Sequence, residues 1–588
     1  MTEPVQITSL DHHFADFITR IDSNPCDELW LAAALASNVA GKGDTCLEMA
    51  AAAGQDVVPF SHVRRRMQAP EISLWSEVLK SCDTIGSPGD YTPLVLTGSG
   101  RLYLHRSWEN ERLVAEGILS RNRWLPLDQE SLDSALDRYF PVTSDMPDLQ
   151  REAAIKALTR CFSVISGGPG TGKSATVARI LALLIELSGD IHPDIALAAP
   201  TGKAAMRLRQ SILQAVGRLD LPPAVRNRLP SDVSTIHRLL GFEASGDGFH
   251  HNRDNLLPCD ILVIDEASMI DLPLMANLLE ALKNDARVIL LGDRDQLASV
   301  EAGAVLADIC AGASLIPPLQ EIDSGSIDEG RSGDGTFITH LTKSYRFGGD
   351  SGIGALSRLI NAGDGSAAVD LLVSGNHDDL VWRPLPVGRS FEKEFTASVR
   401  VEYGAYAQAE TPEEALDELD SFRVLSPLRS GIYGVENLNK LCMTALGLKP
   451  MADERHCRLM PVLVTGNNYE LGLFNGDTGV VMEHENRPSV WFSAQENGLR
   501  HLSPLRLPPH ETAFALTVHK SQGSEFGRLL LILPERMSEV LCRELIYTAV
   551  TRARRRVEIW GTEEVFRQAV GRRTQRNSGL RDNLAGRI

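Results

Sequence analysis

The sequence lacks the patterns of a metal-stabilised or membrane-embedded protein. Its nine cysteines are scattered from Cys26 to Cys542 and include no C-x-x-C pair, so zinc and iron–sulfur sites are not expected. No apolar run approaches the length that crosses a bilayer, and the acidic N-terminus lacks the basic and apolar segments of a signal peptide. Dispersed cysteines are typical of reduced thiols, and we therefore expect a cytoplasmic protein without membrane contact.

Long low-complexity tracts and an excess of basic residues are also missing. The 588 residues are enough for several domains, each with its own core. The formal net charge of −18 argues against a uniformly basic coat for nucleic acid. A local basic groove remains compatible with it, because electrostatic steering depends on where the charges lie.

A glycine-rich segment, Ser166-Gly-Gly-Pro-Gly-Thr-Gly-Lys-Ser174, gives the clearest signal in the chain. An apolar, β-prone run over 161–165 precedes it, and apolar residues recur at helical spacing over 175–187. This strand–loop–helix context is the one that a phosphate loop requires, so we expect a bound nucleoside triphosphate. The residues expected at its phosphates are Gly167, Gly168, Pro169, Gly170, Thr171, Gly172, Lys173 and Ser174.

Each part of this segment has a physical role. Glycines let the backbone N–H groups converge on the phosphates, and the helix N-terminus adds a partial positive charge. Lys173 is expected to neutralise phosphate oxygens, and Ser174 is placed to hold Mg²⁺. A second buried strand, 261–264, ends in Asp265 and Glu266, which we expect to bind the magnesium ion and to polarise the attacking water, respectively.

Three polar residues admit both a nucleotide-binding and an ordinary structural interpretation. Gln150 lies in a predicted helix before the phosphate loop, where it either pairs with the adenine edge or is a surface residue. Gln296 follows a buried strand, 288–293, and is either a sensor of the γ-phosphate or a plain loop residue. Arg552 lies near the end of a helix predicted over 544–553, where it either complements the helix dipole or acts as an arginine finger.

The segment after the strand 195–200 has the chemistry of a nucleic-acid contact. Thr201-Gly-Lys presents backbone N–H groups, a hydroxyl and an ammonium group, which suit a phosphate backbone. The alternative is that Thr201 is an ordinary N-cap of the next helix.

The order of patterns predicts an α/β protein of several parts. A separate N-terminal unit could dock a partner or be a plain scaffold, and two αβ regions follow, each with its own insert. The expected boundaries are 1–115 for the N-terminal unit, 140–345 for the first core with a polar insert at 242–258, 317–336 for a flexible linker without an assigned role, and 346–588 for the second core with a β-rich insert at 458–506.

Seven segments in order resemble the motifs of superfamily 1B DNA helicases, over about residues 145–588. They are the phosphate loop, Ala-Pro-Thr-Gly-Lys-Ala-Ala, Asp-Glu-Ala-Ser, Gly-Asp-Arg-Asp-Gln-Leu, Ser-Tyr-Arg-Phe, Val-His-Lys-Ser-Gln-Gly and Tyr-Thr-Ala-Val-Thr-Arg-Ala. Ser-Met-Ile-Asp-Leu-Pro from Ser268, Leu-Gly-Leu-Phe-Asn-Gly-Asp from Leu471 and Val-Thr-Arg-Ala-Arg-Arg-Arg from Val550 narrow the resemblance. They resemble the RecD family of helicase subunits in bacterial exodeoxyribonuclease V, the RecBCD complex.

The resemblance implies two RecA-like P-loop NTPase domains that use ATP and Mg²⁺, a pin-like insert at 242–258 and an SH3-like insert at 458–506. It makes Gln150 the adenine contact, Lys173 and Ser174 the phosphate and magnesium ligands, Asp265 the second magnesium ligand and Glu266 the catalytic base. It also makes Gln296 the γ-phosphate sensor and Arg346 and Arg552 the arginine fingers. The residues that it assigns to DNA are Thr201, His237, Thr517, His519 and Ser521.

The resemblance also implies an activity and partners. It predicts a 5′-to-3′ DNA helicase that acts on single-stranded and duplex-end DNA, in double-strand-break repair by homologous recombination and in degradation of linear duplex DNA. The N-terminal unit would dock onto a heterotrimer with a RecB-like β subunit and a RecC-like γ subunit, and the nuclease would lie in the β subunit. The alternatives are a free-standing superfamily 1B repair helicase, a non-motor P-loop enzyme such as a kinase, and a purely structural subunit.

Overall fold

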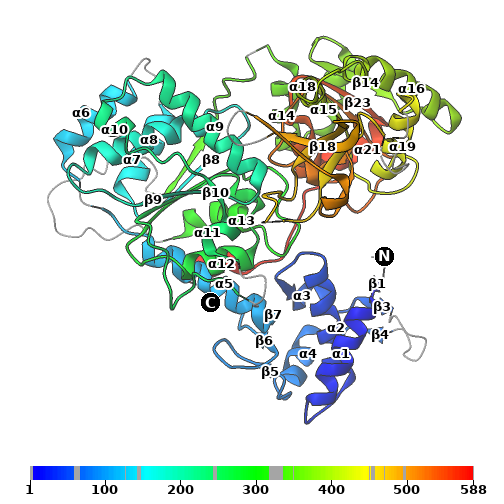
Figure 1. Cartoon of the computed structure of the whole chain (residues 1–588). Helices are drawn as coiled ribbons and strands as arrows, with labels where there is room; N and C mark the ends of the chain where they lie inside the picture. Colours follow the sequence, from blue (N-terminus) through cyan, green and yellow to red (C-terminus); the bar gives the residue numbers. More distant parts are fainter. Residues whose placement is uncertain are drawn as a thin grey trace.

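The computed structural model describes residues 4–58, 67–125, 127–141, 148–242, 248–316, 336–348, 350–448, 451, 457–468, 470–493 and 498–586. The predicted linker lies outside these residues except for its last position, and so do residues 243–247, near the start of the predicted 242–258 insert. Figure 1 shows three bodies, with the N-terminal unit below two α/β cores. Within the described ranges, no helix combines the length and apolar character needed to span a bilayer.

The N-terminal unit is a helical body with two small sheets. Helix α2 (Asp27–Gly41) is buried along most of its length, and β6 (Leu94–Leu96), β7 (Arg101–Leu104) and α5 (His105–Arg121) follow it in the chain. Its other elements are β1 (Val5–Gln6), α1 (Ser9–Ile21), β2 (Cys46–Glu48), α3 (Met49–Ala52), β3 (Asp56–Val58), β4 (Met67–Gln68), α4 (Ile72–Leu79) and β5 (Ile85–Gly86).

The first core is a parallel six-stranded sheet with the order β10-β9-β11-β12-β8-β13. Apolar clusters cover both of its faces, which explains why its central strands are continuous apolar runs. Its strands are β8 (Phe162–Gly167), β9 (Ile195–Ala199), β10 (Ser234–Thr235), β11 (Ile261–Ile264), β12 (Arg287–Gly292) and β13 (Ile338–Leu341). Its helices are α6 (Gln129–Tyr139), α7 (Leu149–Thr159), α8 (Lys173–Leu187), α9 (Gly202–Arg218), α10 (Pro223–Arg226), α11 (Ile236–Leu240), α12 (Leu272–Glu280) and α13 (Val305–Gly312).

The second core repeats this architecture with five parallel strands in the order β14-β23-β22-β15-β21. Its strands are β14 (Leu380–Pro384), β15 (Phe422–Ser426), β21 (Ala515–Thr517), β22 (Phe526–Ile532) and β23 (Ala553–Gly561). Its helices are α14 (Gly352–Ala362), α15 (Gly365–Ser374), α16 (Arg389–Glu402), α17 (Gly404–Ala407), α18 (Pro412–Ser421), α19 (Val435–Ala445), α20 (Arg543–Val550) and α21 (Glu563–Gly571).

Two details of the second core differ from the prediction. The helix predicted over 544–553 ends at Val550, and Ala553 begins strand β23. The three arginines at 554–556 are exposed there and hide the apolar pattern, which starts only at Val557. Strand β14 was not predicted, because its last two residues are Arg383 and Pro384, both exposed.

The β-rich insert is an antiparallel sheet with the order β19-β18-β17-β16-β20. Strand β20 pairs with β16 and extends the sheet to Thr512, beyond the predicted end at residue 506. The sequence predicted a β-rich insert here, and its SH3-like closure stays a prediction. The strands are β16 (Pro461–Val464), β17 (Thr478–His484), β18 (Arg487–Ser493), β19 (Leu499–Leu502) and β20 (His510–Thr512).

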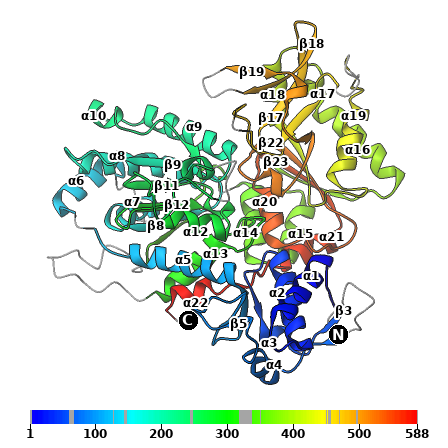
Figure 2. The same ribbon diagram turned by 60° about the horizontal axis from the view of Figure 1, so that its bottom comes forward.

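The last described residues leave the second core and return to the other two bodies. Helix α22 (Leu580–Leu584) packs against α5 and α13, as Figure 2 shows near the C-terminus. Before it, the Arg576 guanidinium donates to the carbonyls of Ser299, Glu301 and Gly303, each at 2.7 Å. The segment therefore joins all three bodies.

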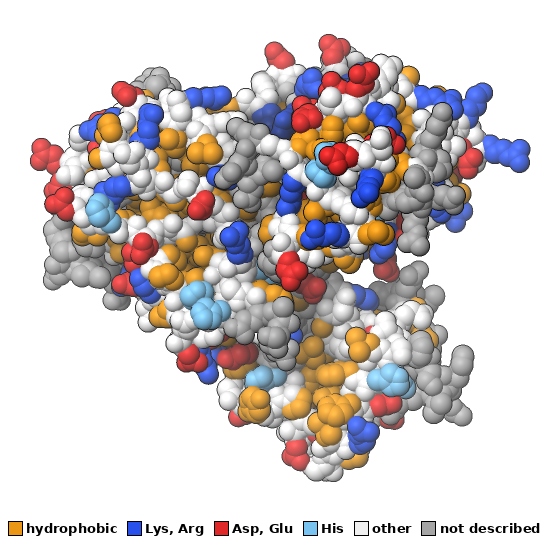
Figure 3. Space-filling model, viewed as in Figure 1, with side chains coloured by type: hydrophobic (Ala, Val, Ile, Leu, Met, Phe, Trp, Pro, Cys, Tyr) orange, Lys and Arg blue, Asp and Glu red, His pale blue; other side chains and the backbone are white. Residues whose placement is uncertain are grey.

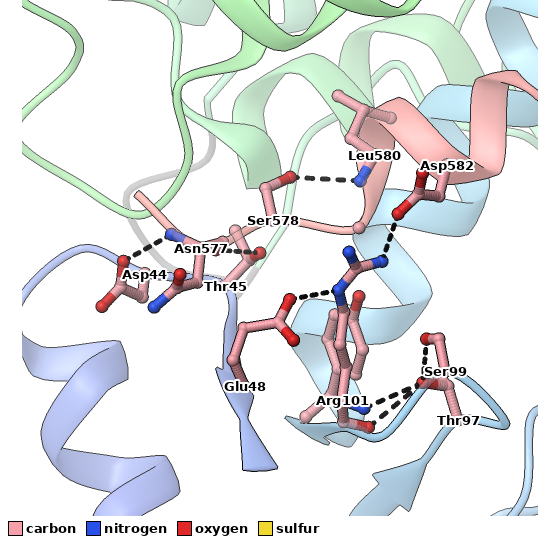
Figure 4. A network of polar contacts seen from close by, with 12 residues as sticks. Asp44, Thr45, Glu48, Thr97, Ser99, Arg101, Asn577, Ser578, Leu580 and Asp582 are labelled. Atoms are coloured by element: carbon pink, nitrogen blue, oxygen red, sulfur yellow. Dashed lines mark hydrogen bonds and ion pairs between the residues drawn. The ribbon is translucent and has the colours of Figure 1, made fainter. Parts of the chain in front are cut away.

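Glu111 of α5 is the centre of this junction. Its buried carboxylate accepts hydrogen bonds from the hydroxyls of Thr45, at 2.5 Å, and Ser578, at 3.0 Å, and from the Gly579 N–H at 3.1 Å. Figure 4 shows the surrounding network, in which Arg101 pairs with Glu48 and Asp582. A buried acceptor with several donors fixes the end of the chain on the N-terminal unit.

We expect Glu111→Ala to lower the free energy of unfolding by about 3 kcal/mol, because it leaves several buried donors without an acceptor. The midpoint of thermal unfolding measures this loss. The matched control is Glu109→Ala on the same helix, which removes only a surface pair with Arg112 and should change stability by less than about 1 kcal/mol. Equal effects of the two variants would contradict the role of Glu111.

The junction should also weaken as the pH rises. Burial raises the pKa of Asp308 from its ordinary 3.8 to about 7, with Glu111 adding to the shift and Ser578 and Arg576 opposing it. The folded state thus binds more protons than the unfolded state between these values, and stability falls across this window as pH rises. Asp308→Asn should therefore be more stable than the parent at about pH 8 by roughly 1–2 kcal/mol, and the difference should shrink below about pH 5. Thermal unfolding of both proteins at the two pH values measures it.

Candidate nucleotide and nucleic-acid site

The phosphate loop lies at the carboxyl end of β8, where β8 pairs with β12 and β13. Gly170 and Gly172 have φ values of 77° and 83°, a left-handed conformation that favours glycine. Lys173 begins α8, and its ammonium group donates to the carbonyls of Gly167 at 2.5 Å and Gly168 at 3.2 Å. The loop has the turn and the helix N-terminus that were predicted for it.

The paired acids follow β11 on the same edge of the sheet. The Glu266 N–H donates to Asp265 Oδ1 at 2.8 Å, and Glu266 has a φ of 52°, which is uncommon for a residue with a Cβ. Burial and the Glu266 carboxylate raise the pKa of Asp265 to about 6, while Lys173 opposes the shift. Such strained, desolvated acids are typical of functional sites.

The donor set fits a divalent cation. Asp265 contributes carboxylate oxygens and Ser174, at the second position of α8, contributes a hydroxyl, and hard oxygen ligands are those that Mg²⁺ prefers. A cation would also offset the unfavourable burial of Asp265 next to Glu266.

Two side chains flank the loop where α8 begins. The Gln150 amide donates to the Thr171 carbonyl at 3.2 Å, and the Tyr345 N–H donates to the Gly170 carbonyl at 2.7 Å. A Cβ added at Gly172 would lie 2.7 Å from the Gln150 amide nitrogen and 3.7 Å from the Tyr345 ring, so both approach the same point. Tyr345 is 62% exposed. It was not identified from the sequence as a site residue, although it directly precedes Arg346.

The second core contributes Tyr547, which the sequence interpretation also missed. Its hydroxyl donates to Asp293 Oδ2 at 2.9 Å, and a Cβ added at Gly168 would lie 2.9 Å from this hydroxyl oxygen. The Gln296 amide donates to the same Asp293 oxygen at 3.2 Å, so Gln296 is buried beside the loop rather than exposed. Helix α20 thus touches the first core at its nucleotide edge.

The two predicted arginine fingers lie between the cores. Arg346 pairs with Glu525 at 2.7 Å. Arg552 is buried, and its guanidinium donates to the carbonyls of Thr548 at 3.1 Å and Ser524 at 3.2 Å. Burial lowers the pKa of Arg552, and the charge of Glu266 is the largest opposing influence.

The five residues predicted to contact DNA fall into different environments. Thr201 caps α9 through Ala204 N–H and lies near Gly523 of the second core, where an added Cβ would be 3.7 Å from its hydroxyl. His237 packs against two phenylalanine rings, and burial lowers its pKa. Thr517 accepts from the Lys520 N–H.

The remaining two lie in the 3₁₀ turn after β21. Burial lowers the pKa of His519, and the charge of Arg576 lowers it further. Ser521 is fully buried and donates to the Val518 carbonyl at 2.7 Å, so its hydroxyl is already used within the second core.

A cavity of 1070 Å³ lies between α9 of the first core and the β-rich insert of the second. None of the five predicted DNA residues lines it. Phe474 of the insert lies against Gly202, with 2.9 Å between its Cβ and a Cβ added there. Figure 3 shows Lys and Arg side chains on both sides of the boundary between the two cores. The basic residues that line the cavity are Lys203, Arg207, Arg209, Arg238, Arg500 and Arg554.

Three family models match segments of the chain. Residues 3–103 match the N-terminal domain of RecBCD enzyme subunit RecD, residues 150–302 match an AAA domain, and residues 512–559 match the UvrD-like helicase C-terminal domain. The first match covers the N-terminal unit up to β7, the second covers β8 to β12 of the first core, and the third covers β21, β22 and most of β23 of the second.

Individual proteins of known sequence also resemble the chain along most of its length. RecBCD enzyme subunit RecD of Mycolicibacterium smegmatis is 37% identical over 590 residues, covering 98% of this chain and 97% of that protein. The RecD subunit of Haemophilus influenzae is 36% identical over 82% of this chain and 80% of its own length. The ATP-dependent RecD2 DNA helicase of Deinococcus radiodurans is 30% identical over 83% of this chain and 59% of its own length.

Among solved structures, the Bacteroides Pif1 helicase in complex with ADP-AlF3 and single-stranded DNA is 16% identical, covers 75% of this chain and 94% of its own, and has a TM-score of 0.36. The identity with the RecD subunits extends over nearly the whole chain. The chain therefore belongs to the RecD family of ATP-dependent DNA helicases.

Proposed function

We propose that the chain is the 5′-to-3′ motor subunit of a RecBCD-type helicase–nuclease. It would assemble with a RecB-like β subunit and a RecC-like γ subunit, and act on duplex ends in recombinational repair and in degradation of linear DNA. The observation that carries the motor assignment is the convergence of two cores on one phosphate loop, since Tyr547 and Arg346 of the second half lie where a Cβ added at Gly168 or Gly170 would meet them. The subunit names of the full-length relatives support the assembly.

The nucleotide chemistry follows from the residues around the loop. Lys173 and the loop N–H groups would hold the triphosphate, with Gln150 on the adenine edge and Tyr345 on its face. Glu266 would accept the proton of the attacking water, and Gln296, held by Asp293, would contact the γ-phosphate. Magnesium, held by Ser174 and Asp265, would neutralise charge on the phosphate oxygens.

Arg346 and Arg552 would stabilise the charge that develops at the γ-phosphate. Both lie between the cores, so the site is complete only when the cores are close. Loss of the γ-phosphate removes the anion that attracts them, and the cleft can then open.

The basic cavity is the proposed path of the DNA strand. Its lining comes from α9 of the first core and from β18, β23 and the neighbouring loops of the second, so a strand in it would contact both cores. Arginine and lysine side chains suit backbone phosphates, and Phe474 offers a ring for base stacking. Thr201 and His237 belong to the first core, and Thr517 and His519 to the second, and none of them lines the cavity.

We also propose a role for each domain of the chain. Residues 1–115 would dock the partner subunits, 140–345 and 346–588 would form the two RecA-like domains, and the insert near 458–506 would be an SH3-like subdomain. The pin-like role of 242–258 is proposed from its position in the sequence, and the described residues of this insert form the isolated bridges Phe242↔Phe249 and Asn252↔Asn255.

We expect Lys173→Gln to reduce ATP hydrolysis by about 100-fold or more, because it removes the cation at the phosphates while leaving the fold intact. Steady-state hydrolysis with and without single-stranded DNA, together with the unwinding of 5′-tailed and 3′-tailed duplexes, measures this. The parent should unwind only the 5′-tailed duplex. Lys283→Gln is the control, since Lys283 forms a surface pair with Asp260 at 2.9 Å. DNA-stimulated hydrolysis retained in Lys173→Gln would refute the assignment.

A free-standing helicase is the second candidate, favoured by the identity with the RecD2 helicase. Copurification separates the two candidates. A tagged chain expressed from its native source should retain β and γ subunits at equal stoichiometry, and a chain that purifies alone yet unwinds the 5′-tailed duplex would favour the free-standing helicase.

A further inference from the structure

Glu525 lies at the boundary of the two cores, directly before β22. Its side chain is only 12% exposed, and arginines from three separate segments surround it. The roles proposed above do not use this residue. Its position is notable because one carboxylate cannot satisfy three guanidinium groups fully.

The contacts are short and come from both oxygens. Arg346 pairs with Oε1 at 2.7 Å, while Arg207 at 2.6 Å and Arg554 at 3.0 Å share Oε2. Burial alone would raise the pKa of Glu525, but Arg207 and Arg346 overcome this, and Arg552 helps to hold the pKa down at about 2. Glu525 is therefore an ionised, buried counter-ion.

The three arginines belong to two different sites. Arg346 overlies the phosphate loop, where a Cβ added at Gly170 would lie 2.3 Å from the Arg346 Cβ. Arg207 on α9 and Arg554 on β23 line the basic cavity, as does Glu525 itself. Glu525 thus forms part of the wall between the nucleotide loop and the cavity.

Arg346 is bound on one side only. One terminal nitrogen of its guanidinium donates to Glu525, and the other is buried without a hydrogen-bond partner among the described residues. A guanidinium group forms its strongest contacts with two oxygens of one anion, as in a bidentate phosphate pair. A triphosphate in the loop would satisfy both nitrogens and therefore competes with Glu525 for Arg346.

We propose that Glu525 is a positioning residue that competes with the nucleotide for Arg346 and thereby couples the nucleotide site to the DNA cavity. The inference rests on the proposed ATP-driven motor. When the γ-phosphate takes Arg346, the Glu525 carboxylate is left with Arg207 and Arg554 and holds both more strongly. These two arginines are then less available to backbone phosphates in the cavity, so nucleotide binding loosens the strand.

Linkage requires the effect to be reciprocal. DNA phosphates that draw Arg207 and Arg554 away would leave Glu525 to hold Arg346 more tightly, which weakens nucleotide binding by the same factor. Glu525 therefore determines how strongly Arg346 can bind the nucleotide and how strongly Arg207 and Arg554 can bind DNA phosphates.

The test uses the full chain, a fluorescent oligodeoxythymidine and the non-hydrolysable analogue AMP-PNP. Glu525→Gln keeps the shape and removes the charge, so it should bind AMP-PNP roughly three- to tenfold more tightly than the parent. The ratio of oligodeoxythymidine Kd values with and without AMP-PNP should exceed one in the parent and move toward one in the variant. An unchanged or weaker AMP-PNP affinity, or an unchanged ratio, would overturn the proposal.

Arg207→Ala provides a second variant with the opposite expected sign. It leaves Glu525 with fewer partners, so the carboxylate should hold Arg346 more firmly and AMP-PNP should bind more weakly, roughly threefold. A merely structural role for Glu525 would weaken binding in both variants. Glu402→Gln is the matched control, since Glu402 pairs with Arg528 of the same strand β22 at 2.5 Å and should leave both affinities unchanged. If the parent binds neither AMP-PNP nor the oligodeoxythymidine, the proposed function fails rather than the role of Glu525.

Discussion

Buried charge at the boundary of the two cores is the constraint on which the rest of the structure depends. The first core presents Lys173, Asp265 and Glu266 on one sheet edge, and the second presents Arg552 and Glu525 opposite them. Buried charges are stable only when they are paired. Each of the two surfaces can therefore exclude water only when the other core or a charged ligand pairs its charges. The cores therefore meet through groups whose partners a charged ligand can exchange.

The parts of the site that the sequence predicts are those with a local cause. The phosphate loop and the acids after β11 need only a buried strand and a turn, and both patterns are visible in neighbouring residues. Tyr547 and Glu525 were missed because their importance comes from contacts across the chain, as with Tyr547 and Asp293, which are 254 positions apart. A tyrosine in a buried helix is ordinary until the opposite surface is known.

The fold shows the same division. Central strands such as β11 and β12 are apolar on both faces and were predicted. Strands β13 and β23 were not predicted. In β13 the polar His340 is partly exposed at the sheet edge, and β23 carries arginines near its start. The buried hydroxyl of Ser521 makes the related point for function. A motif position predicts the segment that contacts a ligand more securely than it predicts which side chain of that segment is free to do so.

The return of the chain end to the N-terminal unit has a consequence for synthesis. Glu111 accepts a hydrogen bond from the Gly579 N–H across 468 positions of sequence, so this contact forms only after residue 579 has left the ribosome. Until then, the pocket around Glu111 lacks part of its partners and the α5 face beneath α22 is open to solvent. Closure of a loop of this length is slow compared with local folding. The surface of the N-terminal unit is therefore complete only in a chain that extends through residues 578–584.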